Sequence, residues 1–257
     1  MTHDPRVLRV VPARRRAAVG RVELGLLGGF RLQFDGQTVE VPASAQRLVA
    51  FLAVNPRSLQ RVFIAGSLWI DSTEEHANAN LRTALWRLQP IGFRLVDATR
   101  NHLALAPDVV VDLHEVTAQA REVLRHGTDV ASDTSDDLLF VDGALLPDWY
   151  DDWTLLERER FRQLRLHALE ALCEQLTSAR SFAAAAQVGI AAVAGEPLRE
   201  SAHRALIKVH LAEGNIGEAL RQYRFYRTLV FEQLGLRPSA EMDRLLENVP
   251  AGLLPTR

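Results

Sequence analysis

The chain has 257 residues, 47% of them hydrophobic, which is enough for two modest domains or one large one around a packed core. Its one cysteine excludes an internal disulfide framework and fits a reducing compartment, and no apolar run is long enough to span a bilayer. The net charge of −2 is divided unevenly, because residues 1–111 carry +5 and the remainder carries −7. Residues 1–21 form a basic arm without the apolar segment of a secretory signal, so we expect a cytoplasmic protein.

Short strands are predicted directly after this arm, because apolar and polar residues alternate there. Two or three strands are expected, at residues 22–27, 30–34 and 38–41. Asp35-Gly36 is a typical hairpin turn, and Pro42 ends the pattern. These features predict a small antiparallel sheet.

Two helices follow, in which apolar residues recur three or four positions apart. Ser44 is placed to cap the first helix, which ends at Asn55-Pro56. Its apolar side is formed by Leu48, Val49, Phe51, Leu52 and Val54. The second helix lies within residues 61–71, and we expect it to pack Phe63, Ile64, Leu68 and Trp69.

A third helix is predicted over residues 72–88, and its two sides differ in an unusual way. The apolar side consists of Ala77, Leu81, Ala84, Leu85 and Leu88. The other side carries Asn78, Arg82, Thr83, Trp86 and Arg87. A plain solvated side usually carries Glu and Lys, so this helix presents amide, hydroxyl, guanidinium and indole groups outward instead.

A β-hairpin is predicted after the third helix, within residues 93–107. We expect Arg94, Arg100 and Asn101 near its turn. Strands, three helices and a hairpin in this order make the layout of a winged helix, whose third helix enters the DNA major groove and whose hairpin is the wing. Arg, Asn and Thr are the residue types that read base edges and contact phosphates.

The second half changes to long helices. Helices are expected at residues 112–126 and 154–179, separated by an acidic loop at 128–137 and an irregular aromatic segment at 138–153. A repeat of 34 residues then pairs Leu172 with Leu206, Cys173 with Ile207, Phe182 with Ile216 and Ala185 with Ala219. This period and these small residues are typical of tetratricopeptide helix pairs. The sequence therefore predicts a mainly α protein with small β-sheets, an N-terminal winged helix-turn-helix at residues 22–111 and a tetratricopeptide-like helical bundle at 112–257.

These segments together resemble one known family. The motifs "AGSLWID" and "ANANLRTALWRL", followed by "LLPDWYDDW" and "LGLRPSAEM", are similar to those of the Streptomyces antibiotic regulatory protein family. The resemblance covers residues 22–248, and the second pair of motifs is the more specific part. It implies an OmpR-type winged helix followed by the bacterial transcriptional activation domain.

The resemblance also implies a function. Members are transcription activators that bind direct repeats in promoters as side-by-side dimers and contact RNA polymerase holoenzyme. Carried over to this chain, the expected partners are double-stranded DNA, the polymerase and a second copy of the chain, in the nucleoid. The DNA-binding residues would be Asn78, Arg82, Thr83, Trp86 and Arg87 on the third helix, with Arg100 and Asn101 at the wing.

Several alternatives stay open at this point. Arg82 and Arg87 are the residues of an ordinary solvated face if Glu75 or Asp71 pairs with them, and Trp86 can instead pack between the helix and the sheet. Arg14, Arg15 and Arg16 favour a solubilising tail over a minor-groove arm. A second function class is a helical adaptor whose winged helix does not bind DNA.

No arrangement of residues indicates an enzyme, a cofactor or a metal site. His203 and His210 lie seven residues apart on one helical side, but they occupy packing positions of the repeat and lack a third ligand. Cys173 falls on an apolar repeat position, which favours a buried structural thiol over a redox sensor. We find no nucleophile, base and orienting residue together, so we predict no catalytic residues.

Overall fold

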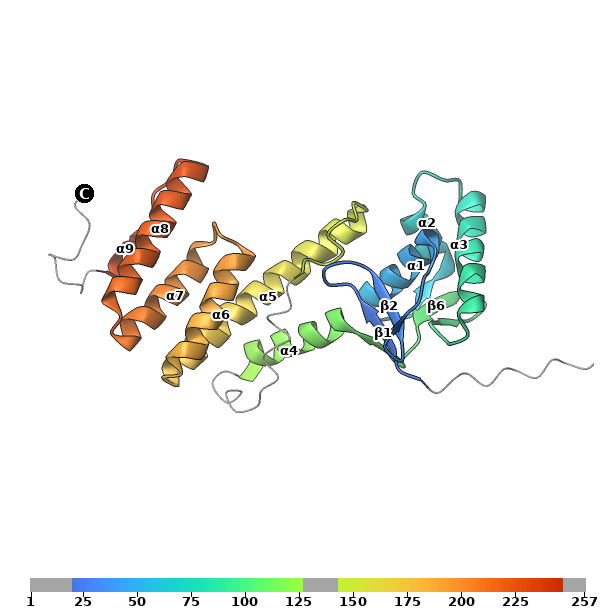
Figure 1. Cartoon of the computed structure of the whole chain (residues 1–257). Coiled ribbons are helices and arrows are strands. Elements are labelled where there is room, and N and C mark those ends of the chain that lie inside the picture. Colours follow the sequence, from blue (N-terminus) through green and yellow to red (C-terminus); the bar gives the residue numbers. More distant parts are fainter. Residues whose placement is uncertain (1–19, 127–142, 247–257) are drawn as a thin grey trace, which may run out of the picture. The chain divides into compact units, whose positions relative to one another are not determined.

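The structure is a computed structural model that describes residues 20–126 and 143–246 (Figure 1). The chain divides into two compact units. The first runs up to Glu23 and over Leu32–Val110, and the second holds Leu24–Arg31 and the chain from Val111 onward. Residues 24–31, which the sequence assigns to the first domain, therefore group with the second unit. Arg14, Arg15 and Arg16 and the predicted acidic loop lie outside the described residues.

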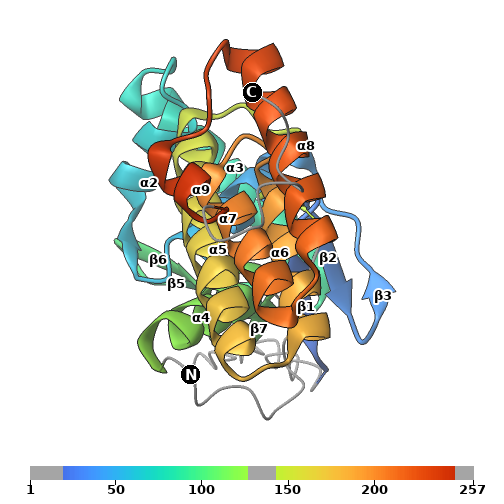
Figure 2. The same ribbon diagram turned by 90° about the vertical axis from the view of Figure 1, so that its left-hand side faces the viewer.

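A four-stranded sheet is formed by strands from both ends of the winged-helix region. Its strands are β1 (Val22–Gly25), β2 (Arg31–Phe34), β3 (Gln37–Thr38) and β7 (Val109–Val111). The order is β3-β2-β1-β7, and Figure 2 shows β3 at one edge. The predicted turn is confirmed, since Asp35 and Gly36 both have positive φ. The third strand is shorter than predicted, because after the bond from Val39 N to Leu32 O the chain leaves the sheet toward Pro42.

Three helices follow in the first unit: α1 (Ala43–Val54), α2 (Arg61–Leu68) and α3 (Glu74–Leu88). Two details of the prediction are wrong. Ser44 does not cap α1, because the helix begins at Ala43, directly after Pro42, and Ser44 therefore lies within its first turn. The side chain of Phe63 is not buried but 49% exposed, because the buried side of α2 is formed by Ile64 and Leu68.

The hairpin is part of a second, three-stranded sheet. It contains β4 (Leu59–Gln60), β5 (Val96–Ala98) and β6 (His102–Leu105), in the order β4-β6-β5. A 3-10 turn, η1 (Gln89–Ile91), links α3 to it. Arg100 and Asn101 lie at the turn as predicted, but Arg94 does not, because it precedes β5 and forms an ion pair with Asp97.

The second unit consists of helices that pack one after another (Figure 1). They are α4 (Asp112–His126), α5 (Asp152–Ser178), α6 (Phe182–Gly195), α7 (Glu200–Glu213), α8 (Ile216–Leu234) and the short α9 (Ala240–Arg244). Within residues 20–126 and 143–246, none of these helices or those of the first unit is long and apolar enough to cross a membrane.

The predicted 34-residue repeat is confirmed by equivalent residues in equivalent places. Leu172 and Leu206 are both buried, as are Ala185 and Ala219. The residues that open the two helix junctions, Arg180 and Gly214, both have positive φ, at 61° and 90°. The helix pairs α5/α6 and α7/α8 are therefore the two repeats of a tetratricopeptide-like bundle.

Close approach of these helices depends on small residues at their crossing. A Cβ on Gly189 of α6 would lie 3.1 Å from Leu206 and 3.4 Å from the sulfur of Cys173. Cys173 is fully buried, and burial raises the pKa of its thiol to about 12. The prediction of a structural thiol agrees with both observations, because a thiol with so high a pKa is not reactive at neutral pH.

An irregular segment before α5 is held by charged side chains. The Asp112 carboxylate accepts hydrogen bonds from the backbone N–H groups of Leu26 and Leu27, at 2.9 to 3.0 Å. Leu27 in turn bridges to Leu145 in the irregular segment. Arg158 of α5 then donates to the carbonyls of Leu145, Leu146 and Trp149. Ionised partners make these hydrogen bonds stronger than neutral ones, so they fix a segment that has no regular structure of its own.

His203 is buried and has both ring nitrogens satisfied. Its Nε2 donates to Pro197 O and its Nδ1 accepts from the amide of Gln222, each at 2.8 Å. Burial lowers the pKa of this imidazole, although the Pro197 carbonyl and Glu200 act in the opposite direction. Both of its ring nitrogens are thus engaged within the bundle, which suits a packing residue rather than a metal ligand.

We predict that the free energy of unfolding decreases as the pH falls below about 6.5. The unfolded chain binds a proton at His203 in that range, whereas the folded chain, with its lowered pKa, binds it less readily. Urea denaturation of wild type and His203→Gln at pH 7.5 and 5.5 measures this. The variant should lose part of the pH dependence, and the control His167→Gln, which alters an exposed histidine, should keep it. An unchanged pH dependence in His203→Gln would refute the assignment.

Candidate nucleic-acid interface

Helix α3 is held by its start and by one buried side. Thr73 caps it, because its hydroxyl accepts from His76 N, and Glu74 and Glu75 complement the helix dipole in the first turn. The predicted apolar side is buried, with Leu85 only partly so. The buried residues are Ala77, Leu81, Ala84 and Leu88, each 7% exposed or less. This packing directs the opposite side of the helix to solvent.

The five predicted residues of α3 form two rows on that outward side. Asn78, Arg82 and Trp86 follow one another four residues apart, and Thr83 and Arg87 form the neighbouring row. All are exposed except Asn78, which is partly buried. Trp86 is 66% exposed, so the alternative in which it packs between the helix and the sheet is wrong.

Most polar groups in these rows are available to a partner. Within the described residues, Asn78 and Arg82 have no hydrogen bond from their side chains, and neither Arg82 nor Arg87 forms an ion pair with Glu75 or Asp71. The Thr83 hydroxyl donates to Ala79 O within the helix, at 3.0 Å. Arg87 donates from Nη1 to the Ser44 hydroxyl, at 2.8 Å, which directs its guanidinium toward the start of α1.

A hollow of about 400 Å³ joins the first part of α3 to the hairpin turn. Asn78 from α3 and Arg100 and Asn101 from the turn line it, so the structure brings these three predicted residues together. Arg82, Thr83, Trp86 and Arg87 lie further along α3 and do not line it. The hollow also contains Gln60, Arg61 and His102, which the sequence reasoning missed.

Arg61, the first residue of α2, positions the hairpin turn. Its backbone N–H donates to Asn101 O at 2.9 Å, and its guanidinium donates twice to Thr99 O at 3.1 and 3.2 Å. The strand β4 directly before it pairs with β6, which places α2 beside the turn. Only the leucine of the two-residue β4 is apolar, so the sequence carries no periodic signal for this strand.

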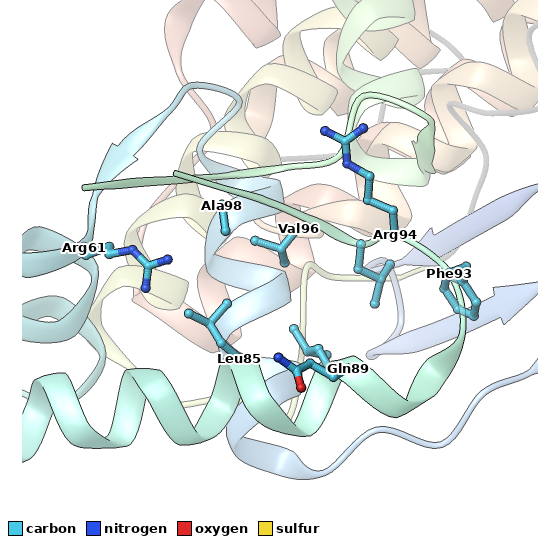
Figure 3. A pocket seen from close by; sticks show the side chains of 9 residues that line it. Arg61, Leu85, Gln89, Phe93, Arg94, Val96 and Ala98 are labelled. Carbon is cyan, nitrogen blue, oxygen red and sulfur yellow. The ribbon is translucent and has the colours of Figure 1, made fainter. Parts of the chain in front are cut away.

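A second hollow, of about 390 Å³, lies between the last turns of α3 and the hairpin (Figure 3). Figure 3 shows Leu85 of α3 and Gln89, directly after it, facing Val96 and Ala98 of the hairpin, with Arg61 and Arg94 on opposite sides. Among the described residues, no carboxylate lines either hollow. Guanidinium groups line both hollows, and although Arg94 pairs with Asp97, those of Arg61 and Arg100 form no ion pair with a described residue and attract a polyanion.

In residues 20–126 and 143–246, no three His, Cys, Asp or Glu side chains gather as a metal site. A protruding polar helix beside a basic hairpin matches the docking surface of a winged helix.

Comparison with known proteins supports this assignment of the fold. The family model described as bacterial transcriptional activator domain matches residues 110–249, more than half of the chain. The chain belongs to this family. This match agrees with the resemblance of its motifs to the Streptomyces antibiotic regulatory protein family.

Two relatives illustrate the similarity. Regulatory protein AfsR of Streptomyces coelicolor is 26% identical over 261 residues, which cover 93% of this chain and 26% of that protein. The chain thus spans about a quarter of the length of this curated relative. The structure of Mycobacterium tuberculosis EmbR in complex with a low-affinity phosphopeptide superposes with a TM-score of 0.71 at 20% identity, covering 93% of this chain and 67% of that chain. The predicted fold class, a winged helix followed by a helical bundle, is confirmed.

We predict that Arg61→Ala loosens the hairpin turn without unfolding the unit. The variant loses both guanidinium bonds to Thr99 O but keeps the backbone bond to Asn101. Amide hydrogen exchange at Thr99 and His102, which bond to each other across the turn, should become several-fold faster, while the midpoint of thermal unfolding changes little. Arg57→Ala, at another exposed arginine of the same unit, is the control. Equal exchange rates in both variants would show that Arg61 does not position the turn.

Proposed function

We propose that the protein is a sequence-specific DNA-binding transcriptional activator that inserts α3 into the major groove and contacts the adjacent backbone through the β5–β6 hairpin. The observation that carries this proposal is the outward row of Asn78, Arg82 and Trp86, whose polar groups lack partners within the described residues. Unpaired guanidinium and amide groups on an ordered helix favour a partner that supplies hydrogen-bond acceptors. The edges of DNA bases and the phosphates do so.

Each side chain has a role that its chemistry supports. Asn78 and Arg82 match the amide and guanidinium contacts made with adenine and guanine edges. Trp86 and Thr83 suit apolar contacts with thymine methyl groups and sugars. Arg87 near the end of α3, and Arg100 and Asn101 at the hairpin turn, suit contacts with phosphates of the groove walls, and Arg61 adds a charge beside the turn.

The helical unit supplies the contacts with other proteins in this proposal. The family description assigns this unit to transcriptional activation. We infer that the protein binds direct repeats in promoters as a side-by-side dimer and recruits RNA polymerase holoenzyme. Direct repeats require copies that face the same way, so the two copies would use different surfaces for each other.

We predict that Arg82→Ala weakens binding to a specific duplex by about 1–3 kcal/mol. The duplex is obtained by selection from a random library, and affinity is measured by fluorescence anisotropy across a salt series. The affinity of wild type should fall steeply with salt, because phosphate contacts release counterions. Binding to an unrelated duplex should change much less in the variant.

The matched control is Arg57→Ala, which removes the same charge from an exposed position of the first unit outside α3 and the hairpin. Its affinity for the specific duplex should equal that of wild type within experimental error. If both variants bind like wild type, α3 is not the reading helix. Binding to no duplex, or binding that hardly depends on salt, would favour the adaptor alternative, because a mostly apolar protein contact responds little to salt.

A further inference from the structure

The second unit contains a cavity that the DNA-binding proposal does not use. It has a volume of about 240 Å³ and lies between α5, the end of α6 and the irregular segment at residues 143–145. Its lining combines apolar side chains with three arginines of α5, Arg158, Arg162 and Arg165. Such a mixture of an apolar floor and a few charged groups is typical of small-molecule sites.

The apolar part of the cavity is rigid. Leu145, Phe161 and Leu166 line it and are themselves 7% exposed or less, so they are fixed by the surrounding core. Two glycines, Gly143 and Gly195, keep its edges free of side chains. Gly143 has a φ of 151°, and a Cβ there would lie 2.5 Å from Gly28 N, so no other residue fits this wall.

Arg158 places an uncompensated positive charge on the wall. Its Nε and Nη2 donate to three backbone carbonyls, which are neutral acceptors. Among the described residues, its Nη1 has no hydrogen-bond partner, and no carboxylate forms an ion pair with this guanidinium. Arg162 differs, because Glu159 and Glu196 both pair with it. A partly buried cation without a counter-charge is stabilised by an anion that reaches it.

We propose that this cavity binds a small organic anion, whose charged group pairs with Arg158 and whose apolar body lies on Phe161 and Leu166. A neutral ligand would leave the Arg158 guanidinium uncompensated, and a cation would be repelled by it. The volume of about 240 Å³ limits the ligand to a compact molecule, since sites for drug-sized ligands have volumes of about 300–1,000 Å³. A single ring bearing one carboxylate has the required size and charge.

Binding there would act on residues that join separate parts of the second unit. Arg158 holds the carbonyls of residues 145, 146 and 149, and Leu145 bridges to Leu27. Leu27 in turn bonds to the carboxylate of Asp112, next to the start of α4. An anion bound to Arg158 would therefore stabilise the contacts that join the end of β1, the irregular segment and α5.

The test uses benzoate as the probe and benzamide as its neutral counterpart of the same shape. The full chain is labelled with ¹⁵N, and each compound is titrated at constant ionic strength set with sodium chloride. Benzoate should give saturable shifts of the amide signals of Leu145, Phe161 and Gly195, with an affinity at least about tenfold higher than that of benzamide. Absence of saturable shifts at these amides, or equal affinities for both compounds, would overturn the proposal.

A variant that fills the cavity tests separately where benzoate binds. Gly195→Leu points a side chain toward Leu166, whose Cδ2 would lie 3.3 Å from the new Cβ. It should abolish the benzoate shifts and leave all three Arg158 bonds in place. The control Gly217→Leu changes a glycine whose new Cβ meets no atom within 4 Å, and it should bind like wild type. If folded Gly195→Leu binds benzoate as wild type does, the ligand does not bind in this cavity. If this variant does not fold, the comparison of benzoate with benzamide on wild type still decides.

Discussion

The buried side of α3 determines which groups the first unit presents to a partner. Ala77, Leu81, Ala84 and Leu88 leave no freedom to rotate the helix about its axis, because any rotation would expose Leu81 and bury Arg82. Removing a buried leucine of this kind costs roughly 2–5 kcal/mol, and burying an unpaired guanidinium costs several more. The orientation of the outward rows therefore follows from packing, not from contacts that these rows make themselves.

Burial of apolar side chains also determines the position of the hairpin. Leu103 of β6 and Leu59 of β4 are fully buried beside each other in the register of the second sheet. Arg61, one residue beyond β4, is thereby brought to the turn and bonds to it. The burial of Leu59 and Leu103 thus brings Arg61 to the turn, and the hydrogen bonds of Arg61 to the turn position the next residues, Arg100 and Asn101.

In the second unit, charged side chains hold the irregular segment before α5 in place, whereas in the first unit buried apolar side chains position α3 and the hairpin. The irregular segment before α5 has few backbone hydrogen bonds of its own, so its carbonyls require donors from elsewhere. Arg158 supplies them, and Asp112 supplies the matching acceptors for the strand end at Leu26 and Leu27. The cost is a guanidinium without a counter-charge, which is the origin of the anion site proposed above.

Much of this architecture could be predicted from periodicity. The spacing of Ala77, Leu81, Ala84 and Leu88 correctly indicated both the helix and its buried side, and the 34-residue repeat correctly paired Leu172 with Leu206. These signals are strong because many residues contribute to each. The outward residues of α3 could also be identified, since they are what remains when the buried side is removed.

Features that depend on a few residues or on distant pairing could not be predicted. The strand β4 has two residues, too few to show alternation, so Arg61 was missed. The sequence also gave no reason to expect residues 24–31 to group with the second unit, because Asp112 binds Leu26 across 86 positions. The Ser44 cap was predicted wrongly since Ser and Pro both favour a helix start, and here the helix begins directly after Pro42.

The most direct test of the central claim is a scan of the selected DNA site with 7-deazapurines, which remove the N7 acceptor of one purine at a time from the major groove. If α3 reads base edges, at least one replacement weakens wild type by about 1–3 kcal/mol and has no effect on Asn78→Ala or Arg82→Ala, because the contact is already lost. The account is contradicted if no replacement weakens wild type, or if both variants keep every sensitivity that wild type shows.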